Sequence, residues 1–219
     1  MALTLANAVT EVRSTINEES PEFWTDAEIT NWIQEGTRVV SSKSLMAEDY
    51  QTIDPLVQNQ LSYSSSDETW IADALEIYSA LYNDGSNKYK GLIKVHPRQL
   101  GNLATGTAGV PKYYCLFNRQ IFIWPLTSAA IAGTGTIDVL FSKETDDITA
   151  LKDEFQHLPI IYSVAKCKHK DRAFSEAKSL FSQFYNELNF ERTDKHDREV
   201  DAVEDFKVPR MGRGGSQRA

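Results

Sequence analysis

Hydrophobic residues recur at helical spacing near both ends of this chain, whereas the middle carries runs of β-branched and aromatic residues. Apolar residues three or four positions apart lie on one face of a helix, and such faces need a partner to cover them. The pattern therefore predicts a bundle built from both ends of the chain with a sheet region between. The spaced residues are Leu5, Val9, Val12 and Ile16 at one end, and Phe174, Ala177, Phe181, Phe184 and Leu188 at the other.

The fold class that we predict is α+β, mainly helical, with a bundle of about four long helices, an inserted antiparallel β region and an extended C-terminal arm. Thr25 stands three residues before Glu28, which is a capping-box pattern for the start of the second helix. We expect one domain over residues 1–190 and the arm over residues 191–219. The predicted helices cover residues 3–18, 25–44, 158–170 and 173–190.

The β-rich insertion is predicted over about residues 70–142. Its clearest signal is a hairpin over residues 111–125, because two aromatic and β-branched runs flank the polar pair Asn118-Arg119. We also predict a strand near residues 75–79, a returning strand at 88–95 and a further strand at 137–141. A short helix is predicted within residues 46–60.

The composition is that of an ordinary globular protein: 219 residues, 41% hydrophobic and 25% charged, with a formal net charge of −8. An acidic chain is a poor candidate for coating nucleic acid, because clustered Lys and Arg drive phosphate binding. No apolar stretch is long enough to span a membrane, and no secretion signal is apparent. We therefore expect a protein made in a cytoplasm, with no membrane partner.

The residue types that carry chemistry are scattered. Cys115 and Cys167 are expected to be buried thiols, and no two of the four histidines are spaced as metal ligands on one helix face. Gly133 and Gly135 form a Gly-x-Gly pattern, but a strand rather than a helix is predicted after it, so a phosphate loop is not expected. We expect no enzymatic activity, no metal and no cofactor.

The composition changes sharply after about Phe190. Residues 191–205 hold seven acidic and three basic residues, whereas residues 206–219 hold four basic residues and no acid. The last segment lacks the apolar residues needed for a core, so it is either a flexible end without function or a peptide arm that becomes ordered on a partner. The arm residues that we single out are Phe206, Lys207, Val208, Pro209, Arg210, Met211 and Arg213.

Four short motifs occur in a fixed order along the chain. They are Phe23-Trp24-Thr25-Asp26-Ala27-Glu28-Ile29, Gly109-Val110-Pro111-Lys112-Tyr113-Tyr114, Trp124-Pro125 and His157-Leu158-Pro159. With paired helices at both ends and a long polar arm, this order resembles the head–tail adaptor (connector) proteins of tailed bacteriophages. The resemblance covers about residues 3–190, and the segment 45–67 is an addition to the usual plan.

The resemblance implies a structural protein of the virion, located at the head–tail junction and assembled in the host bacterial cytoplasm. It implies a homo-oligomeric ring, usually of twelve copies, below the portal protein. In such a ring the helices form the body, the β region extends toward tail or nozzle proteins, and the arm residues Phe206–Arg213 bind the portal. Double-stranded DNA would pass through the lumen without specific binding, repelled by an acidic lining.

Two other functions stay open at this stage. The first is another neck or tail-completion protein, such as a tail-tube or terminator component, which would share the helices and the hairpin. The second is a small enzyme or a cytoplasmic regulatory domain, which would show a compact pocket with convergent polar groups.

Overall fold

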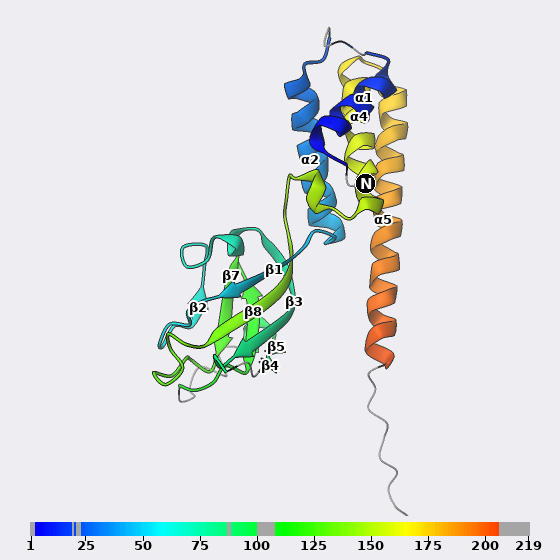
Figure 1. Ribbon diagram of the computed structural model, residues 1–219. Helices are drawn as coiled ribbons and strands as arrows, with labels where there is room; N and C mark the ends of the chain where they lie inside the picture. The colour runs from blue at the N-terminus through cyan, green and yellow to red at the C-terminus, as the bar shows by residue number, and fades with distance from the viewer. Residues whose placement is uncertain (1–2, 19, 21–22, 87–88, 100–107, 206–219) are drawn as a thin grey trace, which may run out of the picture.

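The structure, a computed structural model, describes residues 3–18, 20, 23–86, 89–99 and 108–205, with side chains as far as Asn189. The described chain forms two parts that lie side by side (Figure 1). The helical part comes from both ends of the chain, and the β part comes from the middle. The helices are α1 (Leu5–Ile16), α2 (Asp26–Ser44), α4 (His157–Lys170) and α5 (Phe174–Asp205).

The β part consists of two four-stranded sheets that pack on one hydrophobic core. Sheet A has the strand order β1-β8-β3-β4, and sheet B has the order β2-β7-β6-β5. Neighbouring strands run antiparallel, except β5 and β6, which are parallel. The strands are β1 (Glu48–Ile53), β2 (Ser62–Tyr63), β3 (Ala74–Asn83), β4 (Tyr89–Gly91), β5 (Ile93–Lys94), β6 (Tyr113–Phe117), β7 (Gln120–Trp124) and β8 (Thr136–Lys143).

The prediction of a mainly helical bundle of four long helices is wrong. Beside its helices, the described part of the chain holds two sheets of four strands each, which is an α+β mixture. Two of the helices are short, since α1 has 12 residues and α4 has 14. The helical prediction fails because the β part forms a hydrophobic core of its own, which needs two sheets to enclose it. Tyr63, Tyr82 and Phe141 are among the fully buried side chains of this core.

The short helix predicted within residues 46–60 is also wrong, because β1 occupies this segment. β1 pairs along its whole length with β8, from Glu48 opposite Ser142 to Ile53 opposite Ile137. Strand pairing satisfies backbone groups and places Ile53 in the core, which outweighs a weak local preference for helix. The β part thus begins near residue 48 rather than near residue 70.

The hairpin predicted over residues 111–125 is confirmed. β6 and β7 pair from Tyr113 opposite Trp124 to Phe117 opposite Gln120. Asn118 and Arg119 form the two-residue turn with φ angles of 50° and 54°, as a type I′ turn requires. The strand predicted near 75–79 is the longer β3, and the returning segment 88–95 holds the short strands β4 and β5.

The last helix continues well past its predicted end at residue 190. α5 runs to Asp205 and extends beyond the ends of the other helices (Figure 1). Residues 191–205 are therefore helical and not an extended arm. The change to a charged composition at this point does not end the helix, because Glu, Lys, Arg and Ala are good helix formers. In addition, residues 191–208 contain no Gly or Pro.

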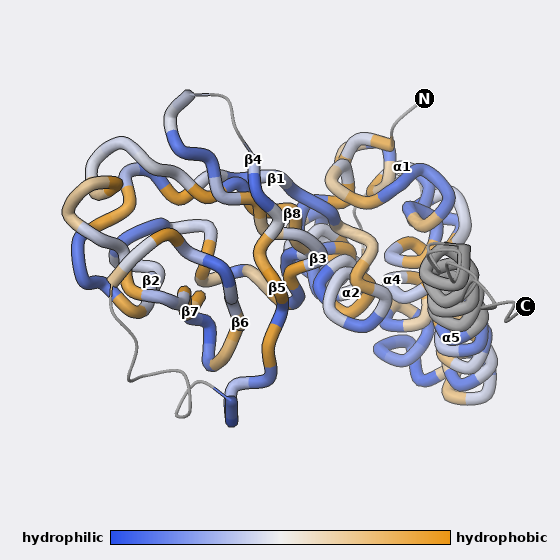
Figure 2. The backbone as a smooth tube through the Cα atoms, turned by 90° about the horizontal axis from the view of Figure 1, so that it is seen from below, coloured by the Kyte–Doolittle hydropathy of each residue, from blue (hydrophilic) through white to orange (hydrophobic). Residues whose placement is uncertain are grey.

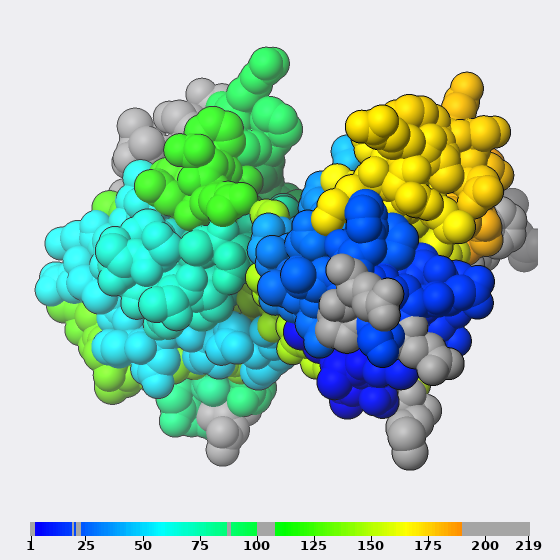
Figure 3. All heavy atoms as spheres, turned by 90° about the horizontal axis from the view of Figure 1, so that it is seen from above, coloured from blue at the N-terminus to red at the C-terminus, as the bar shows by residue number. Residues whose placement is uncertain are grey.

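A small set of contacts joins the two parts, which the view from above shows as separate masses (Figure 3). The Tyr78 hydroxyl of β3 donates a hydrogen bond of 2.9 Å to the Leu45 carbonyl at the end of α2. Ser41 of α2 donates to the Thr145 carbonyl and accepts from the Thr145 N–H, at 3.2 and 3.1 Å. Among the helices that the structure describes, none has the length and apolarity needed to cross a membrane.

The capping box predicted at Thr25 is confirmed. The Thr25 hydroxyl accepts the Glu28 N–H at 3.2 Å, and the Glu28 carboxylate accepts the Thr25 N–H at 3.1 Å. We expect Thr25→Ala to lower the free energy of unfolding by about 1 kcal/mol, because the Glu28 N–H loses the hydroxyl that accepts it, while the backbone N–H at position 25 keeps its bond to the Glu28 carboxylate. Urea unfolding measures the loss, with Asn31→Ala on the exposed side of α2 as the matched control. A Thr25→Ala midpoint equal to the wild-type midpoint would contradict this cap.

Candidate interaction surfaces

An aromatic groove runs along the first half of α5, and we call it the α5 groove. Its volume is about 610 Å³. The helical spacing of α5 places aromatic side chains one turn or two turns apart on this face, and Phe174 and Tyr185 are 58% and 47% exposed. The lining residues are His169, Phe174, Ala177, Lys178, Phe181, Ser182, Tyr185 and Asn186.

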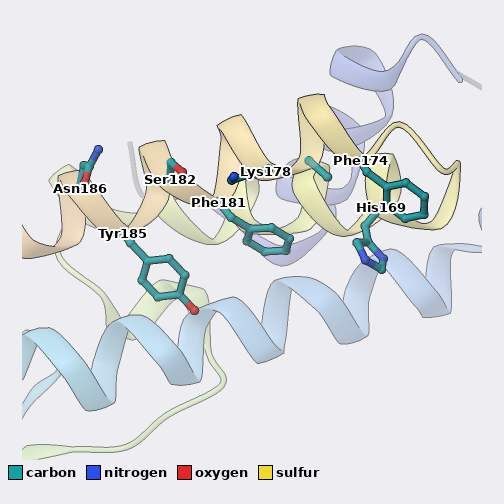
Figure 4. Close-up of a pocket in the computed structure, with 8 residues that line it drawn as sticks. His169, Phe174, Lys178, Phe181, Ser182, Tyr185 and Asn186 are labelled. Carbon is teal, nitrogen blue, oxygen red and sulfur yellow. The ribbon is translucent and has the colours of Figure 1, made fainter.

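The side chains of the groove converge from two helices toward a third. Figure 4 shows Phe181 and Tyr185 of α5 and His169 of α4 pointing toward α2. The imidazole of His169 meets the ring of Phe174 edge to face, with 5.3 Å between ring centroids. Lys178 is an exposed cation on this face, and no carboxylate is among the lining residues. The groove is thus aromatic with one lysine on its face, and aromatic side chains are enriched at protein contact sites.

Sequence reasoning misplaced part of this surface. Helical spacing assigned Phe174 to the same core face as Phe184 and Leu188, which are buried. Phe174 instead lies in the first turn of α5 and is largely exposed. Tyr185 is also exposed, and the helical spacing did not include it. The spacing predicts which residues share a face of a helix, but it does not predict how far along the helix a neighbour covers that face.

A second groove lies at the edge of the β part, beside the β6–β7 turn. It has a volume of about 490 Å³, and Phe117 at its rim is largely exposed. Two ion pairs flank it: Lys94 with Glu76 at 2.9 Å, and Arg119 with Glu144 at 3.3 Å. Because its charged groups are already paired with one another, this groove favours an apolar contact over a charged one.

The outer face of sheet A exposes tyrosine. Tyr50 of β1 lies opposite Leu140 of β8, and both side chains are exposed. The Asp138 carboxylate is nearly buried on the same face and accepts a hydrogen bond of 2.8 Å from Thr52. A hydrogen bond to Asp138 also raises the pKa of the Tyr50 hydroxyl above its usual range. Tyrosine is enriched on surfaces that contact other proteins.

The two thiols are poorly placed for chemistry. Both cysteines are buried, as the sequence predicted. Burial raises the pKa of the Cys115 thiol, and it raises the pKa of Cys167 to about 12. Because the thiolate is the reactive form, neither cysteine is an effective nucleophile near neutral pH.

Several other titratable groups of the helices form structural pairs. Glu35 of α2 accepts hydrogen bonds from the Tyr162 hydroxyl at 2.7 Å and from Lys166 at 2.9 Å, which ties α2 to α4. His157 lies 2.9 Å from Glu187 and ties α4 to α5. Within the part of the chain that the structure describes, no group of three His, Cys, Asp or Glu side chains is arranged to hold a metal ion.

The predicted arm falls in the segment that the structure leaves out. Its residues, Phe206, Lys207, Val208, Pro209, Arg210, Met211 and Arg213, all lie outside the described residues. What the structure adds is the place from which the segment starts, the far end of α5 (Figure 1). In comparisons with known proteins, no protein-family model and no curated protein sequence matches this chain.

Proposed function

We propose that this chain is a structural head-to-tail adaptor of a tailed bacteriophage, which forms a ring under the portal. The observation that carries the proposal is the plan of the chain: helices from both ends form one part, the β part is inserted between them, and α5 leads out of the bundle. This plan has the element order of the adaptor family that the sequence resembles. The proposal assigns no reaction to the chain.

The two parts suit different neighbours in such a ring. The helical part forms the ring body, with the α5 groove available for contact between copies. The β part extends toward the tail or nozzle proteins, and its exposed Tyr50, Leu140 and Phe117 offer the apolar contacts that this attachment needs. The segment after Asp205 reaches the portal from the projecting end of α5.

The charge of the chain suits a channel for DNA. Each copy carries a formal net charge of −8, so a ring of copies builds a strongly negative potential. Like-charge repulsion keeps double-stranded DNA from binding to the lumen while it passes. The ring would thus continue the DNA channel of the portal and act at the head–tail junction of the virion, after assembly in the host bacterial cytoplasm.

The test is attachment to the portal. We expect the full-length chain to co-sediment with portal rings of the virus that encodes it, and electron microscopy to show an added ring below the portal. If the chain does not bind portal rings but binds tail-tube proteins, it is another neck or tail-completion component, and the proposal is wrong.

A further inference from the structure

The helical part has two unlike flanks on opposite sides of α4. α1 and α5 each pack on α4 and α2, and the view from below places α1 on one side of α4 and α5 on the other (Figure 2). In Figure 4 the α5 groove faces the viewer, and α1 lies behind it. The groove and the outer face of α1 therefore point away from each other within one copy.

The outer face of α1 complements the groove in side-chain size. Three of its exposed residues, Ala6, Thr10 and Ser14, are small and lie along one side of the helix. The groove presents large aromatic side chains, Phe174 and Tyr185. Bulky side chains on one helix pack closely against a helix face that carries small ones, since ridges then fit into grooves.

The two surfaces also complement each other in charge. Glu11 is exposed on the outer face of α1, and within the described residues its carboxylate makes no ion pair. Lys178 is exposed in the α5 groove and likewise makes no ion pair among the described residues. Arg13, the one base of α1, is buried and bonds to Asp26 at 2.6 Å, so it does not neutralise the outer face.

The heights of the two surfaces match. α1 ends and α5 begins at the same end of the bundle, which carries the turns from α1 to α2 and from α4 to α5 (Figure 1). Glu11 lies five residues before the end of α1, and Lys178 lies four residues after the start of α5. At 1.5 Å per residue, each charge lies about 6–8 Å from that end, measured along its own helix.

We propose that the α5 groove of one copy receives the outer face of α1 from a second copy, with Glu11 opposite Lys178. The contact is heterologous: it joins two different surfaces, so a pair of copies leaves one groove and one α1 face open to further copies. Repetition of such a contact gives a ring when the rotation between copies closes. Tyrosine is enriched among the few residues that contribute most of the binding energy in protein contacts, and Tyr185 lines the groove. The inference rests on the proposed function, because a ring of identical copies requires two different flanks that meet.

Cysteine cross-linking tests the geometry on the full-length chain. Asn7 on α1 and Ser182 on α5 are exposed and lie at matching heights, whereas both native thiols are buried. We expect a mixture of Asn7→Cys and Ser182→Cys chains to form a covalent dimer with a short bifunctional thiol reagent, and the double variant to form a ladder. Either single variant alone should stay uncross-linked, as should the wild type. Self-linking of Ser182→Cys would indicate a two-fold α5–α5 contact and overturn the proposal.

Charge reversal tests the pairing. We expect Glu11→Lys and Lys178→Glu each to lower the cross-linking yield about fivefold, because like charges then face each other. Combining both reversals in one chain should restore most of the yield. A combined variant no better than either single variant would overturn the Glu11–Lys178 pairing.

The same cross-linking is carried out with and without portal rings, so that two failures can be told apart. Co-sedimentation with the portal but no α1–α5 cross-link in the bound rings would overturn this inference and leave the adaptor function intact. Cross-links in the free chain with no portal attachment would overturn the adaptor function and support this contact.

Discussion

Removing residues 206–219 is expected to leave a folded chain that no longer attaches to portal rings. The deletion touches neither the core of the β part nor the cores of the helical part, all of which lie before Asn189. Far-UV circular dichroism and the thermal midpoint should therefore stay at wild-type values. Co-sedimentation with portal rings should fall to background.

The energetics explain why this segment needs a partner with several kinds of contact. Phe206, Val208 and Met211 would each contribute about 1.5–3 kcal/mol if buried. Fixing the backbone of fourteen residues costs roughly 1–2 kcal/mol per residue, so the three side chains alone do not suffice. Strand addition to the portal, pairing of Arg210 and Arg213 with carboxylates, and simultaneous binding of many copies would supply the rest.

A shorter deletion is the matched control. Removing only residues 214–219 keeps Phe206 to Arg213 and should preserve attachment, since this last stretch has no apolar anchor. If the chain without residues 206–219 still co-sediments with the portal as well as the wild type does, the arm is not the portal-binding element. Attachment would then have to come from the helical part or the β part.

Local signals in the sequence predicted local structure well. The capping box at Thr25 and the hairpin around Asn118-Arg119 occur as expected, because both depend on residues within a few positions of each other. β1 was missed for the opposite reason: its partner β8 lies more than eighty residues away, and segment 48–53 has little hydrophobic alternation of its own. Only the pairing makes this segment a strand.

The candidate surfaces were harder to predict than the fold. A sequence shows that Phe174, Phe181 and Phe184 lie near one face of a helix, but burial depends on where α2 and α4 end. Phe184 is fully buried, whereas Phe174 is exposed. Similarly, the acidic composition of residues 191–205 suggested an extended arm, although α5 continues through this segment. A charged composition indicates that a segment forms no hydrophobic core, but it does not indicate that the segment is not helical.

Replacing Gly36 with leucine is expected to destabilise the helical part strongly. Gly36 is buried where α2 crosses α4, and a Cβ atom there would lie 3.1 Å from the Pro159 Cα and 3.1 Å from the Tyr162 Cβ. Those neighbours are backbone and the root of a buried side chain, so neither can swing aside. A leucine must push the two helices apart, which also pulls Tyr162 from its 2.7 Å hydrogen bond to Glu35.

Two effects oppose each other at this position. Leucine has a better helix propensity than glycine by roughly 0.8 kcal/mol. Overpacking costs about 1–3 kcal/mol where side chains can adjust and more where backbone must move, and the lost Tyr162–Glu35 hydrogen bond adds to it. We therefore expect a net loss of about 2–3 kcal/mol in the free energy of unfolding, measured by urea denaturation.

Asn31→Leu is the matched control for Gly36→Leu, because it adds a leucine to the exposed side of the same helix. Its midpoint should stay within about 0.5 kcal/mol of the wild type. Both variants gain a leucine in α2, so the difference between their free energies of unfolding reports the packing of α2 against α4. If Gly36→Leu were as stable as Asn31→Leu, α2 and α4 would not approach as closely as described, and the flanks on which ring contact depends would have to be placed differently.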